Sequence, residues 1–197
     1  MVGKPRKAVD PRYGGKGRPP RTPKITADDL ASLRLAFDAA SRSQDPSTRV
    51  GVALPVQMSR GPVTITECND LPPNTPLGVW NDREEKYKAV VHAEMAALLR
   101  AGHLARGATL YSSMAPCMEC AKHIAFAGIR RVVAVLPPPS KERWRDEALR
   151  AASYMRNWWR IQVDLIDEDW SHERESNVGH PATDPGQGGD GPGEGGE

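Results

Sequence analysis

The chain has 197 residues, of which 39% are hydrophobic and 26% are charged, and this composition fits a single globular domain with extensions. The net charge of +2 neither indicates nor excludes a partner, because opposite charges at the two ends cancel in the total. No run of about eighteen apolar residues occurs, and the basic first segment is not followed by the apolar core of a signal peptide. We therefore expect a cytoplasmic protein with no membrane partner.

The two ends of the chain differ in composition from its middle. Residues 1–24 carry eight Lys and Arg residues against one acid, Asp10, whereas residues 171–197 are rich in Gly, Pro and acidic residues. Neither end has helical or strand periodicity, so we predict a disordered basic arm over 1–24, a folded domain over 25–170 and a disordered tail over 171–197. Both ends are simplest to explain as solubilising extensions. Contact of the basic arm with nucleic acid or with a neighbouring subunit is the alternative.

Between these ends, apolar residues recur first at helical spacing and then at strand spacing. Thr26 is a suitable N-cap for a first helix, and predicted strands follow at 50–56 and 63–66. A proline-rich loop covers 70–82, and a helix is predicted over 90–99. The remaining predicted elements are a strand at 108–111, a helix at 116–127, a strand at 131–136, a helix at 141–157 and a strand at 160–166. This order predicts an α/β protein, a three-layer α/β/α sandwich with a five-stranded mixed sheet.

Two short motifs point to chemistry, and they are His92-Ala93-Glu94 and Pro116-Cys117-Met118-Glu119-Cys120. Together they match H-x-E followed by P-C-x-x-C, the known signature of zinc-dependent nucleobase deaminases. A catalytic zinc ion takes three imidazole or thiolate ligands and keeps a fourth position for water. We therefore predict Zn²⁺ as the cofactor and His92, Cys117 and Cys120 as its ligands.

The expected helix starts support this assignment. Pro116 favours a helix start, and the dipole and free N–H groups of a first turn stabilise thiolates at Cys117 and Cys120. Glu94 is predicted to be the catalytic residue, which takes a proton from water and delivers it to the leaving amine. Because residues two apart in a helix point to different sides, the entry into the helix must set the relative aim of His92 and Glu94.

Each motif alone has a simpler explanation. A lone C-x-x-C is also typical of a redox pair or of half a structural zinc ribbon, and H-x-E is common by chance. A structural zinc site needs a fourth ligand, for which His123 is the nearest histidine. Cys68 has no partner cysteine, so we expect a free thiol there. The two motifs together favour catalysis, since Glu94 is not needed to hold a metal.

Further segments resemble those of deoxycytidylate (dCMP) deaminases, which belong to the zinc-dependent cytidine and deoxycytidylate deaminase superfamily. Residues 43–51 read SQDPSTRVG, residues 81–94 read NDREEKYKAVVHAE, and residues 120–132 are also similar. The resemblance covers about residues 28–166. It implies a cytidine-deaminase-like fold, the hydrolysis of dCMP to dUMP with release of ammonia, and a homo-oligomer, often a hexamer.

The chain departs from this family at two places near the expected site. The family's G-Y-N-G stretch corresponds here to residues 67–70, so Asn69 is kept as a substrate-binding residue for the sugar. Both glycines are absent, so the resemblance does not extend to control by dCTP and dTTP. Ala96 stands where the family commonly has Asn, which removes one hydrogen-bonding group beside Glu94.

A nucleotide substrate also needs a cation for its phosphate. Lys86 is the substrate-binding residue we select, with Lys88 and Arg83 as neighbouring alternatives, although residues 81–88 also read as a charged, solvated stretch. The rival functions are a tRNA adenosine deaminase, a free-base or nucleoside deaminase, and a zinc module without catalysis. The segments at 43–51 and 82–88 favour a free nucleotide, and the acidic end of the chain argues against RNA binding.

Overall fold

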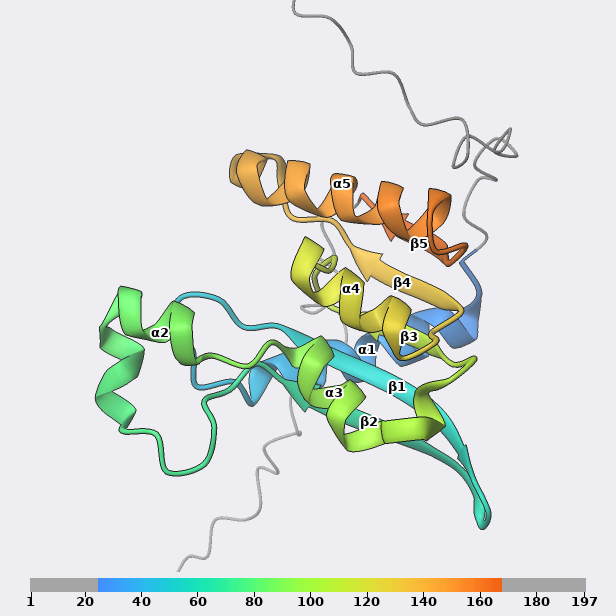
Figure 1. The fold of residues 1–197 in the computed structure, drawn as a ribbon, viewed down its shortest axis with the longest axis horizontal. Coiled ribbons are helices and arrows are strands. Elements are labelled where there is room, and N and C mark those ends of the chain that lie inside the picture. The colour runs from blue at the N-terminus through green and yellow to red at the C-terminus, as the bar shows by residue number, and fades with distance from the viewer. Residues whose placement is uncertain (1–24, 168–197) are drawn as a thin grey trace, which may run out of the picture.

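The centre of the molecule is a five-stranded mixed sheet with the strand order β2-β1-β3-β4-β5 (Figure 1). The computed structural model describes residues 25–167, so the predicted arm and tail lie outside the described residues. β1 pairs antiparallel with β2 and β3, whereas β3, β4 and β5 run parallel. The strands are β1 (Gly51–Met58), β2 (Gly61–Cys68), β3 (Thr109–Ser112), β4 (Arg131–Val135) and β5 (Gln162–Ile166). The predicted fold class is confirmed.

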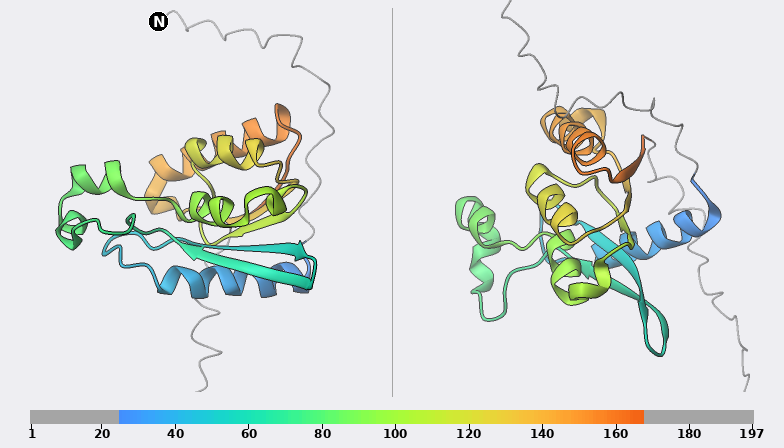
Figure 2. Two further views of the ribbon diagram at one scale, coloured as in Figure 1. Left: turned by 60° about the horizontal axis from the view of Figure 1, so that its bottom comes forward. Right: turned by 45° about the vertical axis from the view of Figure 1, so that its right-hand side comes forward.

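Helices cover both faces of this sheet (Figure 2). α1 (Ala27–Ser41) lies on one face. The opposite face carries α3 (Ala93–Ala101), α4 (Met118–Phe126) and α5 (Glu142–Asn157). A short helix, α2 (Arg83–Ala89), follows a 3-10 turn and lies at one end of the molecule. In the described part of the chain, no helix is long and apolar enough to cross a lipid bilayer.

The alternation of side chains along the strands creates the two cores between these layers. In β4, Val132 and Ala134 pack into the core beneath α3, α4 and α5. Val133 and Val135, the residues between and after them, pack into the core beneath α1. Because β4 is apolar on both faces, it is covered on both faces, as parallel strands generally are.

β1 is longer than predicted and runs through Pro55. A proline donates no ladder hydrogen bond, so it is tolerated in a strand only where its nitrogen has no strand partner. Gly51 exchanges hydrogen bonds with Ser113 on the β3 side, and Pro55, four residues on, faces the same way. β3 pairs only with Val52 and Ala53, so the nitrogen of Pro55 points to a side without a strand.

One predicted boundary at the first motif was wrong, and one helix was not predicted. Residues 83–89, for which no element was predicted, form α2, because the side chain of Asp82 accepts hydrogen bonds from the backbone of Glu84 and Glu85. The predicted helix at 90–99 begins at Ala93 instead, because Val91 pairs with Asp70 in an isolated bridge. His92 is therefore the N-cap of α3, in extended conformation.

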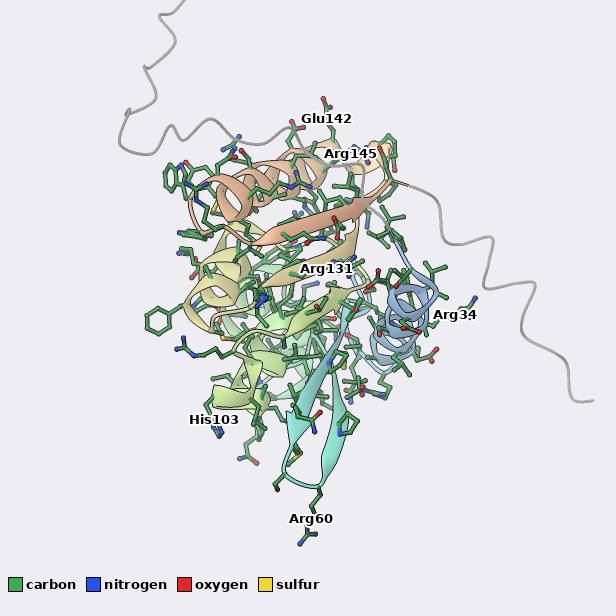
Figure 3. All side chains as sticks on the ribbon, turned by 90° about the vertical axis from the view of Figure 1, so that its right-hand side faces the viewer. Arg34, Arg60, His103, Arg131, Glu142 and Arg145 are labelled. Atoms are coloured by element: carbon green, nitrogen blue, oxygen red, sulfur yellow. The ribbon has the colours of Figure 1, made fainter. Side chains whose placement is uncertain are left out.

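A buried ion cluster ties α1 to the sheet (Figure 3). Arg131 in β4 donates to Asp29 in α1 at 2.7 and 3.0 Å and to Asp164 in β5 at 2.7 Å. Tyr111 in β3 donates to Asp29 at 2.9 Å. Burial alone would raise the pKa of Asp29, but hydrogen bonds from Arg131, Thr26 and Tyr111 outweigh it and lower the pKa to about 2.

This cluster should make the protein sensitive to acid. Because the pKa of Asp29 falls from 3.8 to about 2 on folding, its contribution is fully present above about pH 4 and is lost as the pH falls towards 2. The shift corresponds to about 2 kcal/mol of unfolding free energy. We expect urea unfolding to show that the loss of stability between pH 5 and pH 2.5 is smaller in Asp29→Asn by about this amount.

Asp38→Asn is the matched control for this prediction, since Asp38 is an exposed aspartate on the same helix. It should keep the pH profile of the wild type. Parallel profiles for wild type and Asp29→Asn would contradict the proposed role of the cluster.

Candidate active site

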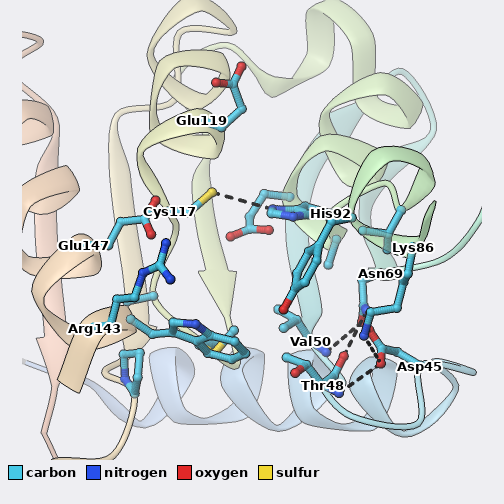
Figure 4. A pocket seen from close by; sticks show the side chains of 18 of the residues that line it. Asp45, Thr48, Val50, Asn69, Lys86, His92, Cys117, Glu119, Arg143 and Glu147 are labelled. Atoms are coloured by element: carbon cyan, nitrogen blue, oxygen red, sulfur yellow. Dashed lines mark hydrogen bonds and ion pairs between the residues drawn. The ribbon is translucent and has the colours of Figure 1, made fainter. Parts of the chain in front are cut away.

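His92, Cys117 and Cys120 come together where α3 and α4 begin, and Figure 4 shows the first two of them. Their donor atoms all lie within 4.8 Å of one another. His92 Nδ1 is 3.2 Å from Cys120 Sγ and 3.6 Å from Cys117 Sγ. Within residues 25–167 this is the one group of three or more His, Cys or acidic side chains with such spacing. The donor set is suited to a metal ion.

Both motifs place their donors at helix caps. Cys117 is the N-cap of α4 in extended conformation, and its sulfur accepts from the backbone nitrogen of Cys120 at 3.5 Å. His92 caps α3 in the same extended conformation. Because His92 precedes the helix and Glu94 lies within it, helical spacing does not govern their relative aim. Since His92 and Cys117 are N-caps, the positive ends of the α3 and α4 dipoles both lie close to the sulfur atoms.

This convergence favours a thiolate. Hydrogen bonds from Cys120 and from His92 lower the pKa of Cys117 to about 4. The hydrogen bond between His92 and Cys117 raises the pKa of His92. The hydrogen bond between the Cys117 and Cys120 side chains raises the pKa of Cys120. Binding of a metal cation would displace the protons that remain on these groups.

Glu94 lies beside the donors and is almost completely buried, with 4% of its surface exposed. Burial raises its pKa above the usual range for a glutamate, and a hydrogen bond with Cys120 offsets only part of this effect. A carboxyl group with a raised pKa, close to a metal-binding cluster, is suited to accept and donate protons near neutral pH.

These groups open into a pocket of about 590 Å³, the size of a site for a small organic molecule. The residues that line it come from the loop before β1, from α2, from the two motifs and from α5. Among them are Thr48, Val50, Asn69, Tyr87, Ala93, Met114, Pro137, Arg143, Trp144 and Glu147. Figure 4 shows His92 and Cys117 between Lys86 and Asn69 on one side and Arg143 and Glu147 on the other.

Lys86 and Asn69, predicted to bind substrate, are both tied to the loop at 45–50. Lys86 Nζ lies 3.0 Å from Asp45 Oδ1 and 2.6 Å from Ser47 Oγ, and both Lys86 and Asp45 are buried. Asn69 donates to Asp45 and to the carbonyl of Thr48, and accepts from the backbone nitrogen of Val50. The two side chains thus hold the loop that forms one wall of the pocket. Their contact with a substrate stays a prediction.

A family model describes residues 26–136 as a cytidine and deoxycytidylate deaminase zinc-binding region. The chain belongs to the cytidine and deoxycytidylate deaminase family. It is 32% identical over 114 residues to cytosine deaminase of Candida albicans, an alignment that covers 55% of this chain and 67% of that enzyme. It is also 32% identical over 109 residues to human deoxycytidylate deaminase, covering 51% of this chain and 60% of that enzyme. The match thus spans less than two thirds of the human protein.

A solved structure of similar fold is the dCMP deaminase from cyanophage S-TIM5, in complex with dCMP and dUMP. The TM-score is 0.54 and the identity is 19%, and the alignment covers 73% of this chain and 100% of that chain. At this identity the likeness supports the fold. The family model and the human relative confirm the resemblance expected from residues 43–51, 81–94 and 120–132.

The buried ion pair between Lys86 and Asp45 should contribute to the stability of the fold. Lys86→Met leaves Asp45 buried without its cation, although Asp45 keeps hydrogen bonds from Ser47 and Asn69. We expect the free energy of unfolding to fall by about 2 kcal/mol. Chemical denaturation measures this change. Lys88→Met is the control, because Lys88 pairs only with exposed Glu84 and Glu85, and equal stability of the two variants would contradict the expectation.

Sequence analysis missed the α5 wall of the pocket, formed by Arg143, Trp144 and Glu147. No motif pointed to these residues in the sequence. One signal could have found this wall. α5 follows β4, and ligands of α/β proteins bind beyond the carboxyl ends of parallel strands, where such a helix begins.

Proposed function

We propose that the protein is a zinc-dependent deaminase that converts dCMP and water to dUMP and ammonia. The observation that carries this proposal is the position of buried Glu94 against the His92–Cys117–Cys120 cluster, at an open pocket. A structural metal site has no use for a buried carboxyl group that is not a ligand. This argues against a zinc module without catalysis.

The chemistry of the donors fits zinc. His92, Cys117 and Cys120 would hold the zinc ion, and three protein ligands of this kind would leave a further position for water. Zinc bound there would act as a Lewis acid that makes water nucleophilic near neutral pH.

In this proposal, Glu94 moves the protons. It accepts a proton from water and delivers it to N3 of the cytosine ring while the hydroxyl group adds to C4. It then takes the second proton from that hydroxyl group and gives it to the exocyclic amino group, so that ammonia leaves and C4 becomes a carbonyl carbon. Burial raises the pKa of Glu94, so its carboxylate is a stronger base towards water than an exposed glutamate. Val50, Ala93, Met114 and Trp144 give the pocket an apolar surface for a planar base.

Two observations favour dCMP as the substrate. Human deoxycytidylate deaminase is a relative, and residues 43–51, which resemble that family, form part of the pocket wall through Asp45, Thr48 and Val50. A second candidate is free cytosine, because the cytosine deaminase of Candida albicans aligns over a similar length at the same identity. Among the described residues nothing favours a tRNA substrate, and the basic arm lies outside them.

We also infer a homo-oligomer, with a hexamer as the form that the resemblance implies. Phe126 at the end of α4 is 93% exposed and Leu99 on α3 is 72% exposed, which is unusual for large apolar side chains and is typical of subunit contacts. Light scattering coupled to size-exclusion chromatography would measure the state. The cytoplasmic location stays a prediction.

The test of the function is a parallel assay of the full chain loaded with zinc. Ammonia release is followed with dCMP, deoxycytidine, cytidine, cytosine and a tRNA anticodon stem-loop. We expect kcat/KM for dCMP to exceed that for each other substrate by about tenfold or more. Preference for cytosine would support the second candidate instead. Zinc binding without turnover of any substrate would overturn the proposed activity.

A further inference from the structure

The pocket contains three long cationic side chains, and they differ in whether their charge is already used. These are Arg83 and Lys86 from α2 and Arg143 from α5. The ammonium group of Lys86 forms a buried ion pair with Asp45 at 3.0 Å and also donates to Ser47. A phosphate that bound Lys86 would have to compete with a carboxylate already in contact, so Lys86 is poorly placed to distinguish a nucleotide from a nucleoside.

Arg83 is also partly engaged. Its guanidinium lies over the ring of Tyr87, 5.6 Å from the ring centroid, on the α2 side of the pocket. Lys88, the third cation of that segment, pairs with Glu84 and Glu85 and is not among the residues that line the pocket. The segment 81–88 therefore offers little free positive charge to a ligand.

Arg143 differs from these cations. It has no hydrogen-bond or ion-pair partner among residues 25–167, whereas Arg145, two positions on, is held by Asp167 and by the carbonyl of Pro137. Arg143 lies in the first turn of α5, across the pocket from Lys86 and Asn69, and its guanidinium points to the interior of the pocket (Figure 4). A planar guanidinium can donate two parallel hydrogen bonds to a phosphate.

Resting on the proposed function, we propose that Arg143 binds the 5′-phosphate of the substrate and thereby selects a nucleotide over a nucleoside or a free base. The amino group of the base has to reach the donor cluster. The phosphate is at the other end of the nucleotide, so it has to lie away from the cluster, against one of the walls of the pocket. α5 supplies the free cation of that wall.

Glu147 allows a second test, because its negative charge should affect phosphate binding in the opposite direction to the positive charge of Arg143. It lies four residues after Arg143, one helical turn away, and lines the same pocket. Its carboxylate opposes the binding of an anion near Arg143. Replacing Glu147 with glutamine should therefore strengthen the binding of a phosphate, whereas removing Arg143 should weaken it.

The experiment compares ligands with and without the phosphate in the full chain loaded with zinc. Calorimetry measures the binding of dUMP and deoxyuridine, and steady-state assays measure KM and kcat for dCMP and deoxycytidine. In Arg143→Ala we expect the Kd for dUMP and the KM for dCMP to rise by about tenfold or more. The constants for deoxyuridine and deoxycytidine, and kcat for both substrates, should stay within about twofold of the wild type. Arg143→Lys should recover part of the affinity.

Arg150→Ala is the matched control, because Arg150 is an exposed arginine on the same helix that does not line this pocket. It should leave all constants unchanged, and Glu147→Gln should lower the Kd for dUMP. If wild type prefers dCMP but Arg143→Ala retains that preference, the assignment of Arg143 is wrong and the proposed function stands. If wild type deaminates cytosine or deoxycytidine in preference to dCMP, the proposed substrate fails, and the role of Arg143 fails with it.

Discussion

Replacing Glu94 with glutamine should abolish turnover and leave the metal in place. Glutamine has nearly the same shape, but its amide group does not ionise near neutral pH, so it can neither take a proton from water nor deliver one to the leaving amine. We expect kcat for the best substrate to fall by about a thousandfold. The zinc content should stay at one ion per chain, because His92, Cys117 and Cys120 are untouched. Activity assays and elemental analysis of the same sample measure both quantities.

Glu142→Gln is the control for this experiment, since Glu142 is an exposed glutamate at the start of α5, outside the pocket that holds Glu94. It should retain full activity. The melting temperature of Glu94→Gln should not fall, because the change removes a carboxyl group whose charged form is disfavoured by burial. Activity within about threefold of wild type in Glu94→Gln would show that another group transfers the protons.

Gly51→Ala should unfold the protein or nearly do so. A Cβ at this position would overlap the backbone carbonyl oxygen of Ala36 and the backbone nitrogen of Ala40, and would lie 2.9 Å from the carbonyl carbon of Ala39. These are backbone atoms of α1, so no side chain can rotate away and the helix itself must shift from β1. We expect a loss of about 4 kcal/mol, above the usual cost of overpacking a core. Urea unfolding measures the loss.

Gly78→Ala is a control with the opposite expectation. A Cβ at Gly78 has no atom within 4 Å, so alanine should be neutral or should stabilise the protein by up to about 1 kcal/mol. If Gly51→Ala were as stable as Gly78→Ala, α1 would not pack as closely on β1 as described. Gly51 itself does not line the pocket, but it adjoins Val50, which does. Any loss of activity in Gly51→Ala would therefore follow from the disturbed packing of α1 on β1.

The sequence predicted the strands and most helices because their apolar patterns are regular. β4 is a continuous apolar run and α1 carries a complete capping box at Thr26 and Asp29, so both could be found from local patterns. The end of β1 could not, because whether Pro55 is tolerated depends on how far β3 pairs alongside it. The start of α3 could not either, because Val91 pairs with Asp70, more than twenty residues away.

In the candidate site, too, the residues of local motifs could be predicted from the sequence, whereas contacts between distant segments could not. His92, Glu94, Cys117 and Cys120 sit in two short motifs whose spacing reflects one local arrangement, a donor at a helix cap, so the sequence alone could group them. Lys86 could be identified as a cation near the site, but its partner, Asp45, lies forty-one positions earlier in the chain. The α5 wall has no motif, because Arg143, Trp144 and Glu147 come close to the two motifs only through the topology that places α5 beside α4.

The position of that wall has a consequence for how the protein could acquire a different specificity. The family match ends at residue 136, and α5 begins at Glu142. The candidate metal donors and Glu94 thus lie within the family segment, whereas the α5 wall of the pocket follows it. Substitutions in α5 can therefore reshape this wall of the pocket without changing any residue of the two motifs. Grafting residues 137–157 from a relative into this chain would exploit that division.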